Sequence, residues 1–206
     1  MFAGKSLFQI FVMGGFTMYV LVFCSVLSLA VIVNRLVDYW RKSKVSRVEF
    51  MDAIRKDLSE KNVAKAAEHC KGTYAPFANV VNSGLKLAGH GEKIISNAME
   101  REITVEVIKL ERYTSIVGTI GNTAVYIGLF GTVLGIIRAF HDISSIGAGG
   151  INVVIGGVSE ALITTAAGLS VAVPAVIAFN YFVKRVDGFV NDMELCASEV
   201  IDLISK

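Results

Sequence analysis

Charged residues are absent from three long stretches of the chain, and these stretches are rich in Phe, Val, Leu, Ile and Gly. Residues 6–34 and 113–137 carry no charge, and residues 143–183 contain a single ionisable side chain, Glu160. A helix needs about 20 mostly apolar residues to cross the hydrocarbon core of a membrane, which is about 30 Å thick. The pattern therefore predicts an all-α membrane protein with three transmembrane helices.

Outside these stretches, apolar residues recur at three- and four-residue steps, which is typical of amphipathic helices. Ser46 and Glu49 have the spacing of a capping box and predict the start of a first short helix. A second helix is expected near 62–71, ended by Gly72, and a third from Pro76. Residues 92–117 contain neither Gly nor Pro, so we expect one long helix that continues straight into the second span.

The third span is also expected to continue beyond the membrane, as an amphipathic C-terminal helix. Spans two and three would thus extend into a cytoplasmic helical bundle. The chain is divided into an N-terminal periplasmic arm with transmembrane helix 1 (1–34), a cytoplasmic helical region (35–111), transmembrane helix 2 (112–139), a short periplasmic turn (140–150), transmembrane helix 3 (151–183) and a cytoplasmic C-terminal helix (184–206).

The distribution of basic residues predicts the orientation of the three spans. The 206 residues are 53% hydrophobic and 18% charged, and their net charge is +2. Residues 35–112 hold 15 of the 20 Lys and Arg residues. Because Lys and Arg gather on the cytoplasmic side of membrane proteins, this segment is expected inside, which puts the N-terminus in the periplasm and the C-terminus in the cytoplasm. The small positive net charge comes mostly from this segment, and it gives no reason to expect nucleic-acid binding.

The residues that could take part in catalysis do not indicate an enzyme. His69, His90 and His141 are isolated and lack the spacing of zinc ligands, and no phosphate-binding loop or nucleophile constellation is present. The three cysteines are scattered and odd in number, so no disulfide framework is expected. We therefore expect neither enzyme activity nor a cofactor nor a metal site.

Spans two and three differ from span one, because they carry small residues at helical steps where span one is bulky. Small residues let helices approach closely in lipid. The pattern leaves open whether these positions pack the hairpin of spans two and three or contact a second subunit. They are Gly121, Ala124, Gly128, Gly131 and Gly135 in span two, and Ala161, Thr165, Gly168, Ala172 and Ala175 in span three.

Polar residues also gather on these two spans, among them Thr132, Thr164, Thr165 and Glu160. An ionisable residue in a span is costly and is a functional candidate, although Glu160 could also be an interfacial residue at the outer end of the span. Proton movement needs titratable groups, and the spans offer one carboxylate. If the protein conducts protons, we expect a second polypeptide to supply the carrier carboxylate.

Two segments resemble the ExbB/TolQ/MotA proton-channel family, in its ExbB/TolQ branch. Residues 119–137, TIGNTAVYIGLFGTVLGII, are similar to the second span of that family, and residues 158–174, VSEALITTAAGLSVAVP, are similar to its third span. The resemblance covers about 90–190. Where the family often has Thr-Ala-Pro, this chain has Ala124 followed by Val125, so the second span is expected to be straighter there.

The resemblance implies a stator subunit in the bacterial inner membrane that uses the proton motive force to drive work at the outer membrane or cell envelope. Members form homo-oligomers, pentamers, around a single-span ExbD/TolR-like partner with an intramembrane Asp, and act on a TonB/TolA-like transducer. By motif, Thr132 and Thr165 face the partner aspartate, Glu160 lines the pore or a subunit interface, and Pro174 bends the third span.

Two other functions remain open from the residues alone. In a passive membrane scaffold, the small residues would only pack helices and Glu160 would be interfacial. A self-contained channel or transporter would need more than one carboxylate and a discontinuous helix for its binding site. Within the family, a MotA-like flagellar or gliding stator component is a further alternative, but three spans rather than four disfavour it.

Overall fold

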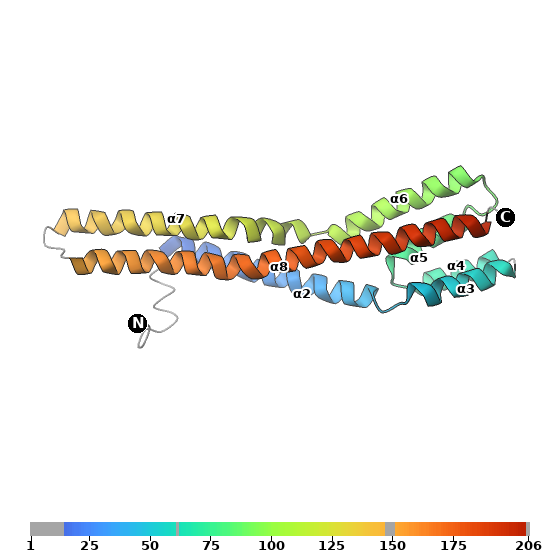
Figure 1. The fold of residues 1–206 in the computed structure, drawn as a ribbon, viewed down its shortest axis with the longest axis horizontal. Coiled ribbons are helices and arrows are strands. Elements are labelled where there is room, and N and C mark those ends of the chain that lie inside the picture. The colour runs from blue at the N-terminus through green and yellow to red at the C-terminus, as the bar shows by residue number, and fades with distance from the viewer. Residues whose placement is uncertain (1–14, 61, 147–150, 205–206) are drawn as a thin grey trace. The chain divides into compact units, whose positions relative to one another are not determined.

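The computed structural model describes residues 15–60, 62–146 and 151–204. Within these ranges the chain is helical with short connections, and no strand occurs, which confirms the all-α prediction. The helices are α2 (Gly15–Lys42), α3 (Arg47–Ser59), α4 (Val63–Lys71), α5 (Pro76–Leu85), α6 (Glu92–Glu111), α7 (Thr114–Ile146) and α8 (Ile151–Ile204), as Figure 1 shows.

Three of these helices are long and apolar enough to cross a membrane, and they coincide with the three predicted stretches. The candidate spans are Gly15–Lys42, Thr114–Asp142 and a part of α8, Ile155–Ile204. The protein is therefore a multi-pass membrane protein. The predicted continuation of the third span is confirmed as well, because α8 runs for 54 residues and ends at Ile204.

The chain divides into two compact units, and each is described by itself. One unit comprises Met1–Val33 and Tyr113–Asn180, and the other comprises Asn34–Arg112 and Tyr181–Lys206. The first unit holds the apolar parts of α2, α7 and α8. The second holds α3 to α6 with the last turns of α2 and the C-terminal part of α8.

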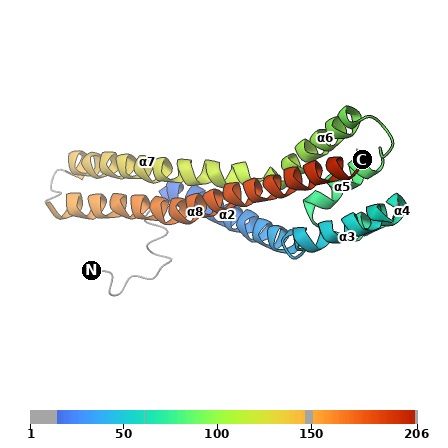
Figure 2. The same cartoon turned by 45° about the vertical axis from the view of Figure 1, so that its right-hand side comes forward.

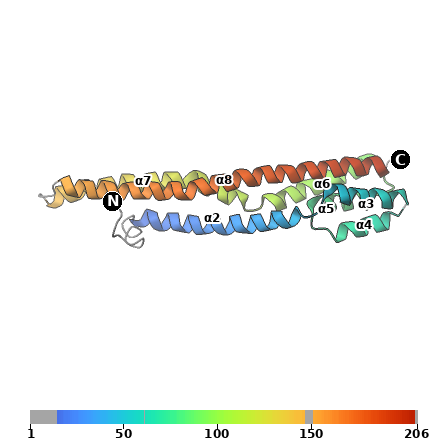
Figure 3. The same ribbon diagram turned by 60° about the horizontal axis from the view of Figure 1, so that its bottom comes forward.

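In the first unit, α7 and α8 run antiparallel and side by side (Figures 1 and 3). Contacts between them follow this direction, since Gly118 lies against Phe179 near one end and Gly135 lies against Ala161 nearer the other. One face of α2 packs on the pair through Leu21, which joins a buried cluster of small and aliphatic residues with Ala124 and Ala172. The opposite face of α2 is bulky and exposed, as expected for a lipid-facing helix.

In the second unit, consecutive helices from α3 to α6 pack against each other (Figure 2). The starts and ends of α4 and α5 follow local signals: the Asn62 side chain accepts a hydrogen bond from the Lys65 N–H at 3.1 Å, and Pro76 occupies the first turn of α5. The predicted capping box at α3 is wrong. Ser46 precedes the first helical residue, but its side chain makes no capping hydrogen bond, so the helix start rests on packing of Phe50, Met51 and Ile54.

The predicted single helix from residue 92 into the second span is also wrong, because α6 ends at Glu111 and α7 begins at Thr114. Arg112 leaves the helical region with ψ 126°, and Tyr113 takes the left-handed conformation with φ 68°. A residue other than Gly rarely adopts that conformation, so a stabilising environment is needed to hold it.

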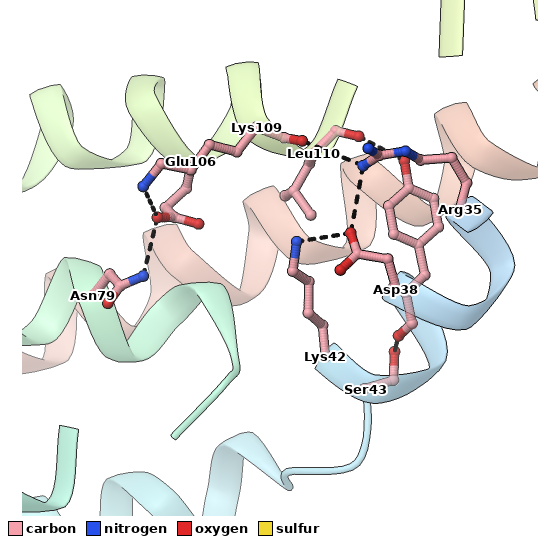
Figure 4. A network of polar contacts seen from close by, with 9 residues as sticks. Arg35, Asp38, Lys42, Ser43, Asn79, Glu106, Lys109 and Leu110 are labelled. Carbon is pink, nitrogen blue, oxygen red and sulfur yellow. Dashed lines mark hydrogen bonds and ion pairs between the residues drawn. The ribbon is translucent and has the colours of Figure 1, made fainter. Parts of the chain in front are cut away.

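That environment is visible at the end of α6, where the last turns of α2 satisfy carbonyl groups that the break leaves without helical partners. The Tyr39 hydroxyl donates to the Leu110 carbonyl at 2.7 Å, and the Arg35 guanidinium donates to the Lys109 carbonyl at 3.4 Å. Figure 4 shows these carbonyl groups beside Arg35, which also pairs with Asp38 at 3.4 Å. Side chains of α2 thus replace hydrogen bonds that a continuous helix would have made.

One turn earlier in α6, a buried carboxylate ties the helix to its neighbour. Glu106 is buried, and its Oε1 accepts from the Asn79 amide of α5 at 3.0 Å and from the Lys109 ammonium at 2.7 Å (Figure 4). A buried carboxylate is costly unless it is paired, and these two donors meet that need. The α5–α6 contact is therefore specified by polar groups as well as by apolar packing.

Candidate functional site

The α7–α8 interface of the first unit brings two backbones into direct contact. A Cβ atom placed on Gly168 would lie 2.6 Å from the Ala124 carbonyl oxygen, and one on Gly128 would lie 2.9 Å from the Thr164 carbonyl oxygen. Both obstacles are backbone atoms, which cannot rotate away as a flexible side chain can. Glycine at these two positions is what allows the two helices to come so close.

Two further glycines on α7 make room for side chains rather than for backbone. A Cβ on Gly131 would lie 2.6 Å from the Thr164 hydroxyl oxygen and 2.8 Å from the Thr17 hydroxyl oxygen. At Gly135, the obstacle is the Ala161 methyl group at 2.8 Å. These four glycines, all among the small residues expected to pack spans two and three, lie where α7 meets α8, and Gly131 also lies against α2.

Threonine hydroxyls of α8 bridge the gap to the backbone of α7. Thr164 and Thr165 each donate toward the Gly128 carbonyl oxygen at 3.2 Å. The Thr164 hydroxyl also lies 2.7 Å from the carbonyl oxygen of Ala161 on its own helix, so its one proton has two acceptors in reach. Thr164 is 2% exposed, whereas Thr165 is half-buried. The interface thus holds two threonine hydroxyl groups, one of which is almost completely buried.

Thr132 lies one turn beyond Gly128 on α7 and is buried. Its hydroxyl donates to the Leu129 carbonyl of its own helix at 2.6 Å. In the described part of the chain, no hydrogen bond joins it to Thr165. The structure therefore places Thr132 one turn from Gly128 and Thr165 against the Gly128 carbonyl, but it does not link the two threonines directly.

Glu160 is half-buried and lines a small cavity of about 40 Å³ at the far end of the interface. Three helices contribute to this cavity, which places a carboxylate, a guanidinium and two hydroxyl groups on one set of walls. Thr132 and Thr165 do not line it. The walls are formed by Gly15, Phe16, Thr17, Gly131, Leu134, Gly135, Arg138, Glu160, Ala161 and Thr164.

Thr17, Arg138 and Thr164 belong to this arrangement, although sequence reasoning assigned none of them to the proton path. A lone threonine in a span usually bonds its own helix, so Thr17 and Thr164 carried little signal. Arg138 lies within α7, which continues to Ile146. The sequence could have marked Arg138 as a candidate, because it is the only charged residue between Arg112 and Asp142.

Pro174 lies inside α8, which continues on both sides of it. Because proline has no N–H, the Ser170 carbonyl loses its helical partner there. The bend expected at this residue stays a prediction.

Among the described residues, no cluster of His, Cys, Asp or Glu could hold a metal ion. The interface can instead do two things chemically. It can present hydroxyl groups along a close helix–helix contact, and it can offer one carboxylate, that of Glu160, at the cavity. Neither a nucleophile with a neighbouring base nor a phosphate cradle accompanies these groups in the described ranges.

Comparisons with known proteins agree with this reading of the membrane helices. Residues 73–195 match the profile of the MotA/TolQ/ExbB proton channel family. The chain is 40% identical over 141 residues to the biopolymer transport protein ExbB of Xanthomonas campestris, a match that covers 57% of this chain and 56% of that protein.

Two other relatives extend the comparison. The chain is 43% identical over 91 residues to the Tol-Pal system protein TolQ of Pseudomonas aeruginosa, covering 44% of this chain and 39% of that protein. It is 27% identical over 193 residues to ExbB of Salmonella typhimurium, covering 90% and 79%. The chain thus spans about half the length of the Xanthomonas relative. Since the matching profile covers more than half of this chain, including the α7–α8 interface, the chain belongs to the MotA/TolQ/ExbB proton channel family.

Proposed function

We propose that the protein is a proton-channel stator subunit of an energy-transducing motor in the bacterial inner membrane. It couples the proton motive force to work at the outer membrane or cell envelope. The observation that carries the proposal is the interface of α7 and α8, where buried hydroxyl groups and one half-buried carboxylate lie along closely packed apolar helices. A passive scaffold needs the glycines but has no use for the polar groups.

The proton carrier is assigned to a partner, since threonine hydroxyls do not titrate in a useful range and Glu160 is the single carboxylate of the third span. The partner is an ExbD/TolR-like single-span protein with an intramembrane Asp. Thr132 and Thr165 face that aspartate and exchange hydrogen bonds with it. Glu160 acts at the outer end of the path, in the pore or at a subunit interface.

Around this partner the chain forms a homo-oligomer, which we take to be a pentamer. Motion of the assembly passes to a TonB/TolA-like transducer. The positive charge of residues 35–112 puts the N-terminus in the periplasm and the C-terminus in the cytoplasm. In this orientation Glu160 lies toward the periplasm, where protons enter.

The test replaces the polar groups one at a time in cells that depend on the system. Thr132→Val and Thr165→Val keep the side-chain shape and remove the hydroxyl, and Glu160→Gln removes the charge. Each is expected to abolish energy-dependent function while the subunit still co-purifies with its partner. Ser170→Ala is the matched control, because Ser170 is exposed and its hydroxyl bonds only the Ala166 carbonyl of its own helix at 2.8 Å.

The outcomes separate the channel from the scaffold. Full activity of all three variants would contradict the proposal and favour a scaffold. Loss of activity together with loss of the partner would indicate a packing role for the residue concerned. Retained assembly without activity is the result that the channel requires.

A further inference from the structure

The second unit contains an open apolar groove between the last turns of α2 and the adjoining part of α8. It is lined by Leu36, Val37 and Trp40 of α2 and by Tyr181 and Arg185 of α8, and its volume is about 340 Å³. Its four apolar and aromatic side chains are all more than 40% exposed, and Trp40 reaches 65%. So much exposed apolar surface in one place marks a site of interaction.

The groove lies where the chain leaves the membrane. Its α2 residues begin two positions after Asn34, the last residue of the first charge-free stretch, and its α8 residues surround Val183, the last residue of the third. Trp and Tyr concentrate at the level of lipid headgroups, because their rings are apolar and their N–H and O–H groups are polar. The position of the groove along both helices therefore matches the headgroup region of one leaflet.

The polar groups at the groove are cationic. The Arg185 guanidinium lines it and donates to the Ser43 hydroxyl, while its Nε is buried without a hydrogen-bond partner. The Lys44 ammonium lies 3.9 Å from the centre of the Trp40 ring. Neither Arg185 nor Lys44 forms an ion pair with any described residue, and no carboxylate lines the groove. The nearest acidic residue on α2, Asp38, is already paired with Arg35 and Lys42.

We propose that this groove binds an anionic phospholipid, with an acyl chain on Leu36, Val37, Trp40 and Tyr181 and the phosphate on Arg185. A planar guanidinium with several N–H donors suits a phosphate, and unpaired basic residues beside a span attract anionic lipids. Lys44 contributes positive charge beside the Trp40 ring. The proposal rests on the chain spanning a membrane and does not depend on proton conduction.

Trp40 is the only tryptophan of the chain, so its fluorescence reports directly on the groove. The full chain is reconstituted into vesicles that contain either brominated phosphatidylglycerol or brominated phosphatidylcholine in an unlabelled background. Bromine quenches a tryptophan in contact with the labelled lipid. We expect phosphatidylglycerol to occupy the groove roughly fivefold more readily than phosphatidylcholine.

Arg185→Gln is expected to remove this preference, and Arg185→Lys to keep part of it. Lys184→Gln is the matched control, because Lys184 is the adjacent basic residue, is exposed and does not line the groove. Circular dichroism and gel filtration check that each variant folds.

Three results would overturn the proposal. Equal quenching of the wild-type chain by both lipids would remove the specificity, and this comparison needs no variant. An equal loss of preference in Arg185→Gln and Lys184→Gln would reduce the effect to general surface charge. Absence of quenching by either lipid would mean that protein, such as a second copy of the chain, covers the groove.

Discussion

Gly168→Ala is the sharpest test of the α7–α8 contact. The added methyl group would meet the Ala124 carbonyl oxygen at 2.6 Å, and the helices would have to separate by roughly 0.8 Å to restore an ordinary contact of 3.4 Å. Overpacking of this kind costs about 1–3 kcal/mol, and the better helix propensity of alanine returns at most about 1 kcal/mol. Because the obstacle is backbone, we expect a cost near the upper end of this range and thus a net loss of about 2 kcal/mol in the free energy of unfolding.

The assay is equilibrium unfolding of the purified chain in detergent micelles, followed by circular dichroism. Gly156→Ala is the matched control on the same helix, since nothing lies within 4 Å of a Cβ placed there. That variant should match or slightly exceed the wild type in stability. Equal stability of Gly168→Ala and Gly156→Ala would refute the claim that the two backbones touch at Gly168.

Three further predictions concern the second unit. Tyr39→Phe removes the hydroxyl that caps the end of α6 and should lower the free energy of unfolding by about 1–3 kcal/mol, measured as above; the exposed Tyr74→Phe should change nothing. Burial raises the pKa of the Cys70 thiol to about 11, so we expect it to stay protonated near neutral pH and to react slowly with a maleimide until denaturant is added. The hydrogen bond to Asp57 raises the pKa of Lys65 above its ordinary 10.5, so the stabilisation from this pair should persist below that value and disappear as the pH rises through the raised pKa. In a pH titration of stability, Asp57→Asn should be less stable than the wild type below pH 10.5, and equal stability of the two at every pH would contradict this.

The hydrophobic pattern of the sequence was enough to predict the membrane helices, because the requirements for crossing lipid are local to each segment. A charge-free stretch of sufficient length must be helical in lipid, where every backbone group needs a partner within its own segment. The continuation of α8 to Ile204 followed from an amphipathic stripe in the same way. The helices expected near 62–71 and from Pro76 match α4 and α5, and the structure shows the Asn62 side chain and the Pro76 ring at their starts.

The break before α7 could not be predicted, because its causes lie far away in the sequence. Tyr113 and its neighbours contain no residue that commonly ends a helix. The Lys109 and Leu110 carbonyl groups are satisfied by Arg35 and Tyr39, more than 70 residues earlier. Helix propensity describes a residue and its nearest neighbours. Tertiary hydrogen bonds of this kind can override it, and the sequence gives no sign of them.

For a related reason, only part of the candidate site could be predicted from the sequence. Glu160 stood out because a lone carboxylate in a span is rare, and Gly128 and Gly168 stood out by their spacing. Which threonine is buried depends on the rotation of α8 against α7, so the burial of adjacent Thr164 and Thr165 could not be predicted from the sequence. The structure places Thr164 deeper than Thr165 and adds Thr17 from α2.

The most direct test of the proton-channel claim is proton flux into vesicles loaded with a pH-sensitive dye, with the wild-type chain and its Asp-bearing partner reconstituted together. Thr165→Val removes a hydroxyl proposed to bond a charged group, so we expect flux to fall roughly tenfold or more while Ser170→Ala retains it. Vesicles that contain the chain without its partner should remain impermeable to protons. Wild-type flux through Thr165→Val, or through the chain alone, would contradict the account.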